Sequence, residues 1–194
     1  MPEKYNAING WSDEGMFSVY RHLIDTLPTN AIFIEAGCWK GRSSTYLLEY
    51  RQEKDREDID VYFVDRFTGD EYGIKGNDGD DVQTFFKNLK NAGFHTKEDY
   101  FIHIGDSIHF ATTKLSRMRL EYPDLFIAVY LDNNHQENYV RQEILEYKKY
   151  CDIISGHDYL DPTIRRVVGE VLGQVKDFRS SYLYQPPITL STQV

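Results

Sequence analysis

The segment from Ala31 to Thr45 constrains the fold more than any other part of the chain, because an apolar run leads through two glycines into a helix-forming stretch. Ile32 to Ile34 form a short run typical of a buried strand. Gly37 and Gly41 allow the backbone to turn sharply and to approach a ligand, and Ser43 to Thr45 open a helix whose first amide groups lack partners. The segment predicts a strand, a ligand-binding turn and a helix. An ordinary connecting turn in an α/β domain is the alternative.

The spacing of this turn indicates which ligand it accepts. A dinucleotide fingerprint needs Gly-x-Gly-x-x-Gly so that a pyrophosphate reaches the helix N-terminus. This chain has Glu-x-Gly-x-x-x-Gly instead, with Trp39 in the place of the second glycine. The acid Glu35, two residues before the first glycine, suits a cofactor with a cationic end and no phosphate, a description that S-adenosylmethionine fits. A nicotinamide-dependent oxidoreductase on the same kind of sheet is a rival interpretation.

Four further apolar runs end in acids or small polar residues. Val61 to Val64 leads into Asp65, roughly 20 residues after the glycine turn, where a ribose-binding carboxylate is expected. The other runs are Tyr100–Ile104 before Gly105-Asp106-Ser107, Leu125–Leu131 before Asp132-Asn133-Asn134-His135, and Ile153–Ile154 before Ser155-Gly156-His157-Asp158. Ligands of open α/β sheets bind outside the carboxyl ends of the strands, so these polar residues are expected to share one edge. Each acid alone is also a candidate helix cap.

Apolar residues at helical spacing predict helices between the strands. The predicted ranges are 13–27, 82–92, 136–150 and 163–172. Residues 66–81 are rich in Gly and Asp, and they form either a mobile lid over the carboxyl edge or a long connection.

Several short sequence motifs follow one another in a fixed order along the chain. They are Gly10-Trp11, Glu35 to Ser43, Val61 to Asp65 with Thr68-Gly69-Asp70, Gly105-Asp106-Ser107, Leu131-Asp132 with His135, and Gly156-His157-Asp158-Tyr159. Together they resemble the class I S-adenosylmethionine-dependent methyltransferases, in the small branch that also resembles macrocin and sugar O-methyltransferases. The resemblance covers residues 10 to 172, most of the chain.

This resemblance implies an α/β, Rossmann-like fold with a mostly parallel central sheet and helices on both faces. It implies one methyltransferase domain over residues 1–194, with a leading helix at 13–27, a core at 31–172 and closing strands within 175–194. That tail either completes the sheet or reaches a second subunit of a homo-oligomer. The cofactor S-adenosylmethionine is expected across the first two strands, and the acceptor at the fourth and fifth. The expected cofactor-binding residues are Glu35, Gly37, Cys38, Trp39, Gly41, Ser43, Asp65, Arg66, Asp106, Ser107 and Asp132.

The chemistry of methyl transfer predicts the remaining site residues. Because the sulfonium methyl is already activated, the enzyme chiefly aligns the reactants, but a hydroxyl acceptor must also lose a proton. The predicted catalytic residues are His135, His157 and Asp132; the two histidines suit a base near neutral pH, although each is also a candidate structural histidine. Mg²⁺ or another divalent cation is the other means of lowering the pKa of the acceptor hydroxyl, and its predicted ligands are Asp132, His157 and Asp158. Without a metal, Asp132 is expected to face the amino group of the cofactor.

The chain departs from its relatives at two places. They commonly carry Asp-Gly-Asp-His after the fourth strand, whereas this chain has Asp132-Asn133-Asn134-His135 and lacks the second acid. The usual Pro-Gly-Gly turn before the fifth strand is replaced by Tyr150-Cys151-Asp152. A catalytically silent protein that binds S-adenosylmethionine or acts as a scaffold is therefore a second hypothesis.

Composition limits the partners. A hydrophobic content of 41% and a charged content of 27% are typical of a folded chain. The formal net charge of −9, with Lys and Arg scattered, argues against nucleic acid and favours a small neutral or cationic acceptor. Cys38 and Cys151 are too few for a disulfide scaffold, no apolar run reaches the roughly 18 residues of a membrane span, and the first residues lack a signal-peptide core. We therefore expect a soluble, cytoplasmic protein with no membrane partner.

Overall fold

The computed structural model describes residues 2–68 and 81–186. Most of the segment 66–81, for which a lid is one prediction, lies outside the described residues, and so do Gly69 and Asp70 of the motifs above. Residues 187–194 lie outside them as well. The strands are β1 (Ile32–Ala36), β2 (Asp60–Asp65), β3 (Phe101–Ile104), β4 (Ile127–Leu131), β5 (Ile153–Gly156), β6 (Lys176–Phe178) and β7 (Ser181–Tyr184). The helices are η1 (Lys4–Ala7), α1 (Glu14–Thr26), α2 (Arg42–Glu53), α3 (Asp81–Asn91), α4 (Ser107–Phe110), η2 (Ala111–Leu115), α5 (Ser116–Glu121), α6 (Glu137–Tyr147) and α7 (Pro162–Leu172).

The strands form one sheet in the order β3-β2-β1-β4-β5-β7-β6. Strands β1 to β5 run parallel to one another, and β7 runs antiparallel to both β5 and β6. The carboxyl ends of the five parallel strands therefore lie at one edge, with β1 and β4 side by side where the strand order reverses. This confirms the predicted α/β, mostly parallel fold. The tail segment 176–184 pairs with β5 of the same chain, which is the first of the two alternatives for that tail.

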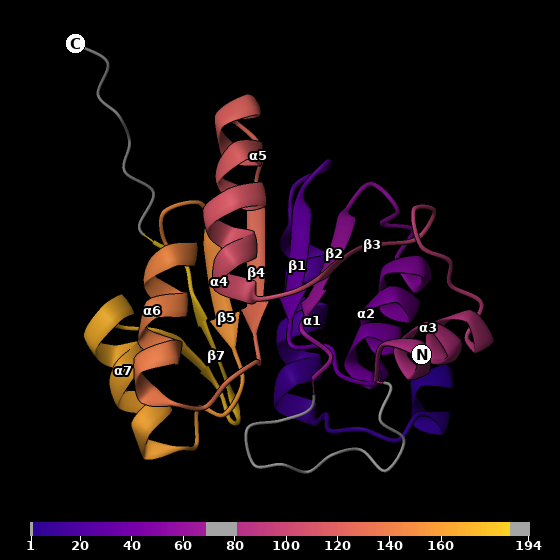
Figure 1. The fold of residues 1–194 in the computed structure, drawn as a ribbon, viewed down its shortest axis with the longest axis horizontal. Helices are drawn as coiled ribbons and strands as arrows, with labels where there is room; N and C mark the ends of the chain where they lie inside the picture. The colour runs from indigo at the N-terminus through magenta and orange to yellow at the C-terminus, as the bar shows by residue number, and fades with distance from the viewer. Residues whose placement is uncertain (1, 69–80, 187–194) are drawn as a thin grey trace.

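Helices cover both faces of the sheet (Figure 1). Helices α1 to α3 pack on one face together with Phe33 of β1, and α4 to α7 pack on the other with Ile32 and Ile34. Successive residues of a strand point to opposite faces, so Ile32 to Ile34 present apolar side chains to both faces, and all five residues of this central strand are buried. Such burial on both faces is the reason why the strand reads as a continuous apolar run.

Four predicted helices correspond to α1, α3, α6 and α7, with ends that differ by at most three residues. The continuous helical run at 107–121 was not predicted. Asp106 begins it as an N-cap, since its Oδ1 accepts a hydrogen bond of 2.8 Å from the amide of His109. Its apolar residues Phe110, Ala111 and Leu115 then turn toward the sheet. In the described ranges, no helix is long and apolar enough to span a membrane.

Candidate functional site

The turn between β1 and α2 contains three residues with positive φ: Gly37 at 96°, Trp39 at 40° and Gly41 at 84°. A Cβ atom on Gly37 would lie 2.0 Å from the carbonyl oxygen of Asp132, and one on Gly41 would lie 2.5 Å from Cδ1 of Leu89. The turn is as sharp as predicted. Packing against the end of β4 and against α3 excludes a side chain at both positions, so the turn itself requires glycine, and the approach of this backbone to a ligand stays a prediction.

Asp65, at the end of β2, holds this turn in place. Its Oδ2 accepts the amides of Cys38 and Trp39, each at 2.7 Å, and its Oδ1 accepts the amide of Phe67 at 2.6 Å. Burial raises the pKa of Asp65, while these three backbone donors oppose the rise. The carboxylate thus fixes the two segments that flank the expected cofactor position, and a direct bond to a ribose stays a prediction.

Glu35 faces the interior. Its side chain has no exposed surface, and its carboxylate accepts hydroxyl hydrogen bonds from Tyr20 at 2.8 Å, Ser43 at 2.5 Å and Ser44 at 2.7 Å. Burial raises its pKa to about 7 against the effect of these donors. The expectation that Glu35 and Ser43 touch the cofactor directly is wrong, because both side chains are buried between α1, α2 and the sheet. The thiol of Cys38 is buried as well and points to the carbonyl of Glu35 at 3.4 Å.

A second polar group joins the ends of β2 and β3 to α6. Arg66 forms an ion pair with Asp106, the hydroxyl of Tyr139 donates to Asp106 at 3.1 Å, and the Arg66 guanidinium lies 5.5 Å from the centre of the Tyr139 ring. Arg66 and Asp106 therefore stay accessible candidates for cofactor binding. Ser107 does not, because it is buried and its hydroxyl lies 2.9 Å from that of Tyr147.

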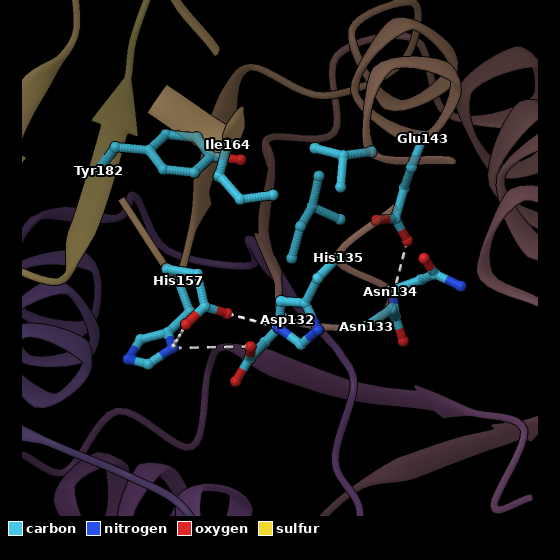
Figure 2. A pocket seen from close by; sticks show the side chains of 11 residues that line it. Asp132, Asn133, Asn134, His135, Glu143, His157, Ile164 and Tyr182 are labelled. Atoms are coloured by element: carbon cyan, nitrogen blue, oxygen red, sulfur yellow. Dashed lines mark hydrogen bonds and ion pairs between the residues drawn. The ribbon is translucent and has the colours of Figure 1, made fainter. Parts of the chain in front are cut away.

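Three side chains at the ends of β4 and β5 form a cluster that could hold a cation. Asp132, His135 and Asp158 each offer one ligand atom, and these atoms all lie within 4.8 Å of one another. His135 Nε2 lies 2.6 Å from Asp158 Oδ2 (Figure 2). We call these three residues the cation cluster. It contains two of the three predicted metal ligands, but His135 stands in the place predicted for His157. Mixed carboxylate and imidazole ligands fit a divalent ion.

His157 lies beside the cluster between carboxylates. Its Nδ1 is 3.2 Å from Asp158 Oδ1 and 3.7 Å from Asp132 Oδ1, and its Nε2 is 3.2 Å from Asp13 Oδ2. Burial acts to lower the pKa of His157, but these acids outweigh it and raise the pKa to about 9. A pKa in this range favours the protonated imidazole at neutral pH, which disfavours His157 as a general base, and its catalytic role stays a prediction.

The two carboxylates of the cluster differ in their ionisation. Burial raises the pKa of Asp132 to about 6, although His157 opposes the rise. Burial acts in the same direction on Asp158, but its bonds to His135 and His157 outweigh it and hold the pKa of that carboxyl well below its usual range. Asp158 also has a positive φ of 55°, a strained backbone for a residue other than glycine. Both groups are ionised near neutral pH, which suits cation binding.

The cluster lines a small pocket, partly open to solvent, between the ends of β4 and β5 and the helices α6 and α7 (Figure 2). The apolar part of its wall includes Ile164 and Tyr182, and a third acid, Glu143, enters from α6. Glu143 is 2% exposed and accepts the side-chain amide of Asn133 at 2.6 Å. Burial raises its pKa to about 7 against the hydrogen bonds from Ser107 and Asn133.

Sequence reasoning missed Asp13, Tyr139 and Glu143. Asp13 is the first residue of the predicted helix at 13–27, which the structure shows to be its N-cap. Tyr139 and Glu143 lie within the amphipathic helix at 136–150, where neither stands out. An acid at an inward position of an amphipathic helix is a signal that could have pointed to Glu143. Glu143 lies one turn before Tyr147 on the inner face of α6. Asn134, in the place of the relatives' second acid, accepts the amide of Gln136 at 2.7 Å and shapes the start of α6.

Comparison with known proteins gives matches of structure alone. No family model and no curated protein sequence matches the chain. Among solved structures, the O-methyltransferase NovP aligns with a TM-score of 0.64 at 13% identity over 88% of this chain and 79% of its own. CalS11, a calicheamicin methyltransferase, aligns with a TM-score of 0.58 at 18% identity over 88% and 76%. A putative rRNA-methylase from Clostridium thermocellum aligns with a TM-score of 0.57 at 13% identity over 90% and 95%. The chain therefore has the fold of the class I S-adenosylmethionine-dependent methyltransferases.

Proposed function

We propose that this chain is an S-adenosylmethionine-dependent methyltransferase that acts on a hydroxyl of a small molecule, with a divalent cation held by Asp132, His135 and Asp158. The observation that carries the proposal is the cation cluster itself. It lies at the carboxyl ends of β4 and β5, next to the turn held by Asp65, in a fold shared with the O-methyltransferase NovP. Ligands of such sheets bind at this edge, where the strand order reverses.

The residues divide the work of the reaction. The turn at 37–41 and Asp65 would hold the cofactor so that its sulfonium methyl faces the pocket, and the pocket would align the acceptor oxygen with that methyl. Methyl transfer forms the oxygen–carbon bond and breaks the sulfur–carbon bond, which leaves neutral S-adenosylhomocysteine. A divalent cation, when bound, supplies a positive charge that lowers the pKa of the acceptor hydroxyl. The proton that the hydroxyl loses passes to solvent, to which the pocket is partly open.

A metal-free variant of the same reaction uses His135 as the base. Its Nε2 contact with Asp158 would orient the ring, in the way that a carboxylate orients a catalytic imidazole. His157 is less suited to this role, because the carboxylates around it raise its pKa to about 9. The two variants differ in their response to a chelator.

The cofactor is tested by thermal unfolding. S-adenosylhomocysteine is expected to raise the melting temperature, because a ligand of the native state stabilises it by mass action, whereas NADH is expected to leave it unchanged. Protection by NADH alone would overturn the proposal in favour of an oxidoreductase. Radiolabelled methyl from S-adenosylmethionine, offered with a panel of small hydroxyl compounds, then separates an active enzyme from a silent binding protein.

The cation is tested by calorimetric titration with Mn²⁺. Asp158→Asn is expected to weaken Mn²⁺ binding by tenfold or more, because the cluster loses a charged ligand. Asp161→Asn is the matched control, since Asp161 lies three residues on and its carboxylate caps α7 by accepting the amides of Thr163 and Ile164. Equal affinity in both variants would reject the cluster as a metal site, and turnover that survives a chelator would favour His135 as a metal-free base.

A further inference from the structure

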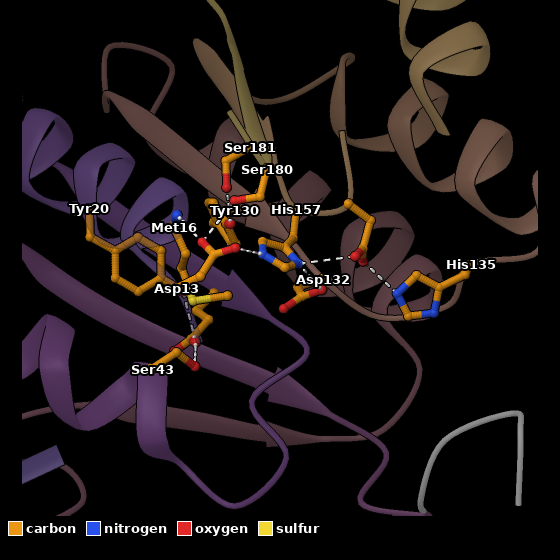
Figure 3. Close-up of polar contacts among 12 residues, drawn as sticks. Asp13, Met16, Tyr20, Ser43, Tyr130, Asp132, His135, His157, Ser180 and Ser181 are labelled. Carbon is orange, nitrogen blue, oxygen red and sulfur yellow. Dashed lines mark hydrogen bonds and ion pairs between the residues drawn. The ribbon is translucent and has the colours of Figure 1, made fainter. Parts of the chain in front are cut away.

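Asp13 joins three separate elements next to the site. Its Oδ1 accepts the amide of Met16 at 3.0 Å, which caps α1, and the hydroxyl of Ser180 at 2.7 Å, from the turn between β6 and β7 (Figure 3). The packing there is tight, because a Cβ atom on Gly15 would lie 2.1 Å from the Ser180 hydroxyl oxygen. One oxygen of Asp13 is thus fully used to fix the carboxylate between α1 and the hairpin.

The other oxygen of Asp13 faces His157. Asp13 Oδ2 lies 3.2 Å from His157 Nε2, while His157 Nδ1 lies 3.2 Å from Asp158 Oδ1 on the opposite side of the ring. A carboxylate only accepts hydrogen bonds, so a ring held between two carboxylates carries a proton on each nitrogen. The orientation of the His157 ring is therefore fixed at both ends.

We propose that Asp13 is a positioning residue. Its contact with Nε2 of His157 holds that nitrogen away from the cation cluster, so that Nδ1 contacts Asp158 Oδ1. Asp158 Oδ1 is then occupied by His157, and Asp158 Oδ2 meets His135. This division explains why His135 joins the cluster and His157 does not, although His157 is the histidine adjacent to Asp158 in sequence. That this orientation serves cation binding rests on the proposed function, whereas the contact between Asp13 and His157 does not depend on it.

Asp13→Asn separates the positioning role from the structural one. The amide of Met16 only donates, so it requires the oxygen of the new side chain on its own side, and asparagine caps helices as well as aspartate does. The –NH₂ group then faces His157 and donates to Nε2, which must lose its proton. The fold is expected to persist, with a melting temperature near that of the native protein, while the protonation pattern of the ring changes.

Two matched variants serve as controls. Ser180→Ala removes the other partner of the same carboxylate and leaves the contact to His157. Asp161→Asn makes the same chemical change at the N-cap of α7, where the carboxylate accepts the amides of Thr163 and Ile164. Both are expected to leave the His157 ring as in the native protein.

Long-range ¹H–¹⁵N spectra of the imidazoles, recorded at one neutral pH without cofactor, metal or acceptor, provide the measurement. We expect protons on both nitrogens of His157 in the native protein and in both controls, and a neutral ring protonated only at Nδ1 in Asp13→Asn. An unchanged His157 signal in Asp13→Asn would overturn the assignment, as would the same change in Ser180→Ala. Since the spectra need no ligand, failure of the proposed methyl transfer would not affect them.

Discussion

At the scale of single residues, Asp65 has the clearest effect on the cofactor position, since one carboxylate accepts three backbone amides around it. Asp65→Asn replaces one acceptor oxygen with a donor, which must then face an N–H group. We expect the affinity for S-adenosylhomocysteine to fall by at least tenfold, in line with about 1–3 kcal/mol for a buried polar group left without a partner.

Asp60→Asn is the control for this prediction, because Asp60 is an exposed acid at the opposite end of the same strand. Calorimetric titration of both variants gives the comparison. If Asp65→Asn binds S-adenosylhomocysteine as tightly as Asp60→Asn does, the cofactor does not lie beside this turn.

Glu35 gives a prediction about pH. Its pKa is about 7 in the folded protein against an ordinary value of 4.5, so between these pH values the folded state binds more protons than the unfolded state. Stability therefore falls as pH rises through this interval, by about 3 kcal/mol from this one group. Glu35→Gln is expected to flatten the fall, though not to abolish it, because Glu143 has a pKa raised to about 7 as well.

Urea unfolding of the native protein and of Glu35→Gln at several pH values between 5 and 7 measures this slope. Glu121→Gln, at an exposed position of α5, is expected to keep the native slope. A Glu35→Gln curve parallel to the native one would mean that Glu35 does not titrate in this range.

At the scale of elements, the close approach of the β1–α2 turn to β4 sets a limit on substitution. Gly37→Ala places a methyl group 2.0 Å from a carbonyl oxygen and requires a positive φ, so we expect a loss of roughly 2 kcal/mol or more. Gly169→Ala is the opposite case: nothing lies within 4 Å of its added Cβ, and an exposed helix position is expected to gain about 0.5–1 kcal/mol. Urea unfolding of both variants measures the difference, and similar stabilities would show that the turn can move away from β4.

Helices and strands could be predicted from the sequence where a single pattern of apolar residues runs through the whole element. The strand β1 and helix α7 are continuous apolar or amphipathic patterns, and their positions follow from burial on the sheet. The run at 107–121 escaped prediction because its cap, Asp106, also reads as a strand-end acid of the site. Acids at strand ends have two uses, as caps and as ligands, and only the structure assigns Asp106 to a cap and an ion pair.

At the scale of the whole molecule, the parallel sheet explains why the site was predictable at all. It brings Asp65, Asp132 and Asp158 to one edge from positions far apart in sequence, as the rule for open α/β sheets requires. Which of two neighbouring histidines faces the cluster could not be predicted, because that choice depends on Asp13, which reaches His157 across 144 residues. Contacts between distant segments of this kind leave no periodic pattern.

The charge of the whole molecule gives the last prediction, on the class of acceptor. A structure described as a putative rRNA-methylase shares this fold, yet this chain has a formal net charge of −9. Its two adjacent basic pairs are Lys148-Lys149 and Arg165-Arg166. Of these, Lys149 pairs with Glu146, and Arg166 pairs with Glu137. The positive charge of a basic side chain that is paired with an acid is largely neutralised, so these residues attract a phosphate backbone only weakly.

We therefore expect a fluorescent RNA hairpin to show no change in anisotropy with this protein at 50 mM salt, a condition that favours non-specific binding. Affinity for a phosphate backbone falls steeply with salt, because each phosphate contact releases a counterion. Binding at 50 mM salt that disappears by 200 mM would reveal a basic surface and contradict the small-molecule proposal. Methyl transfer to a small hydroxyl compound, unchanged across the same salt range, would support it, since an acceptor without a phosphate chain releases no counterions.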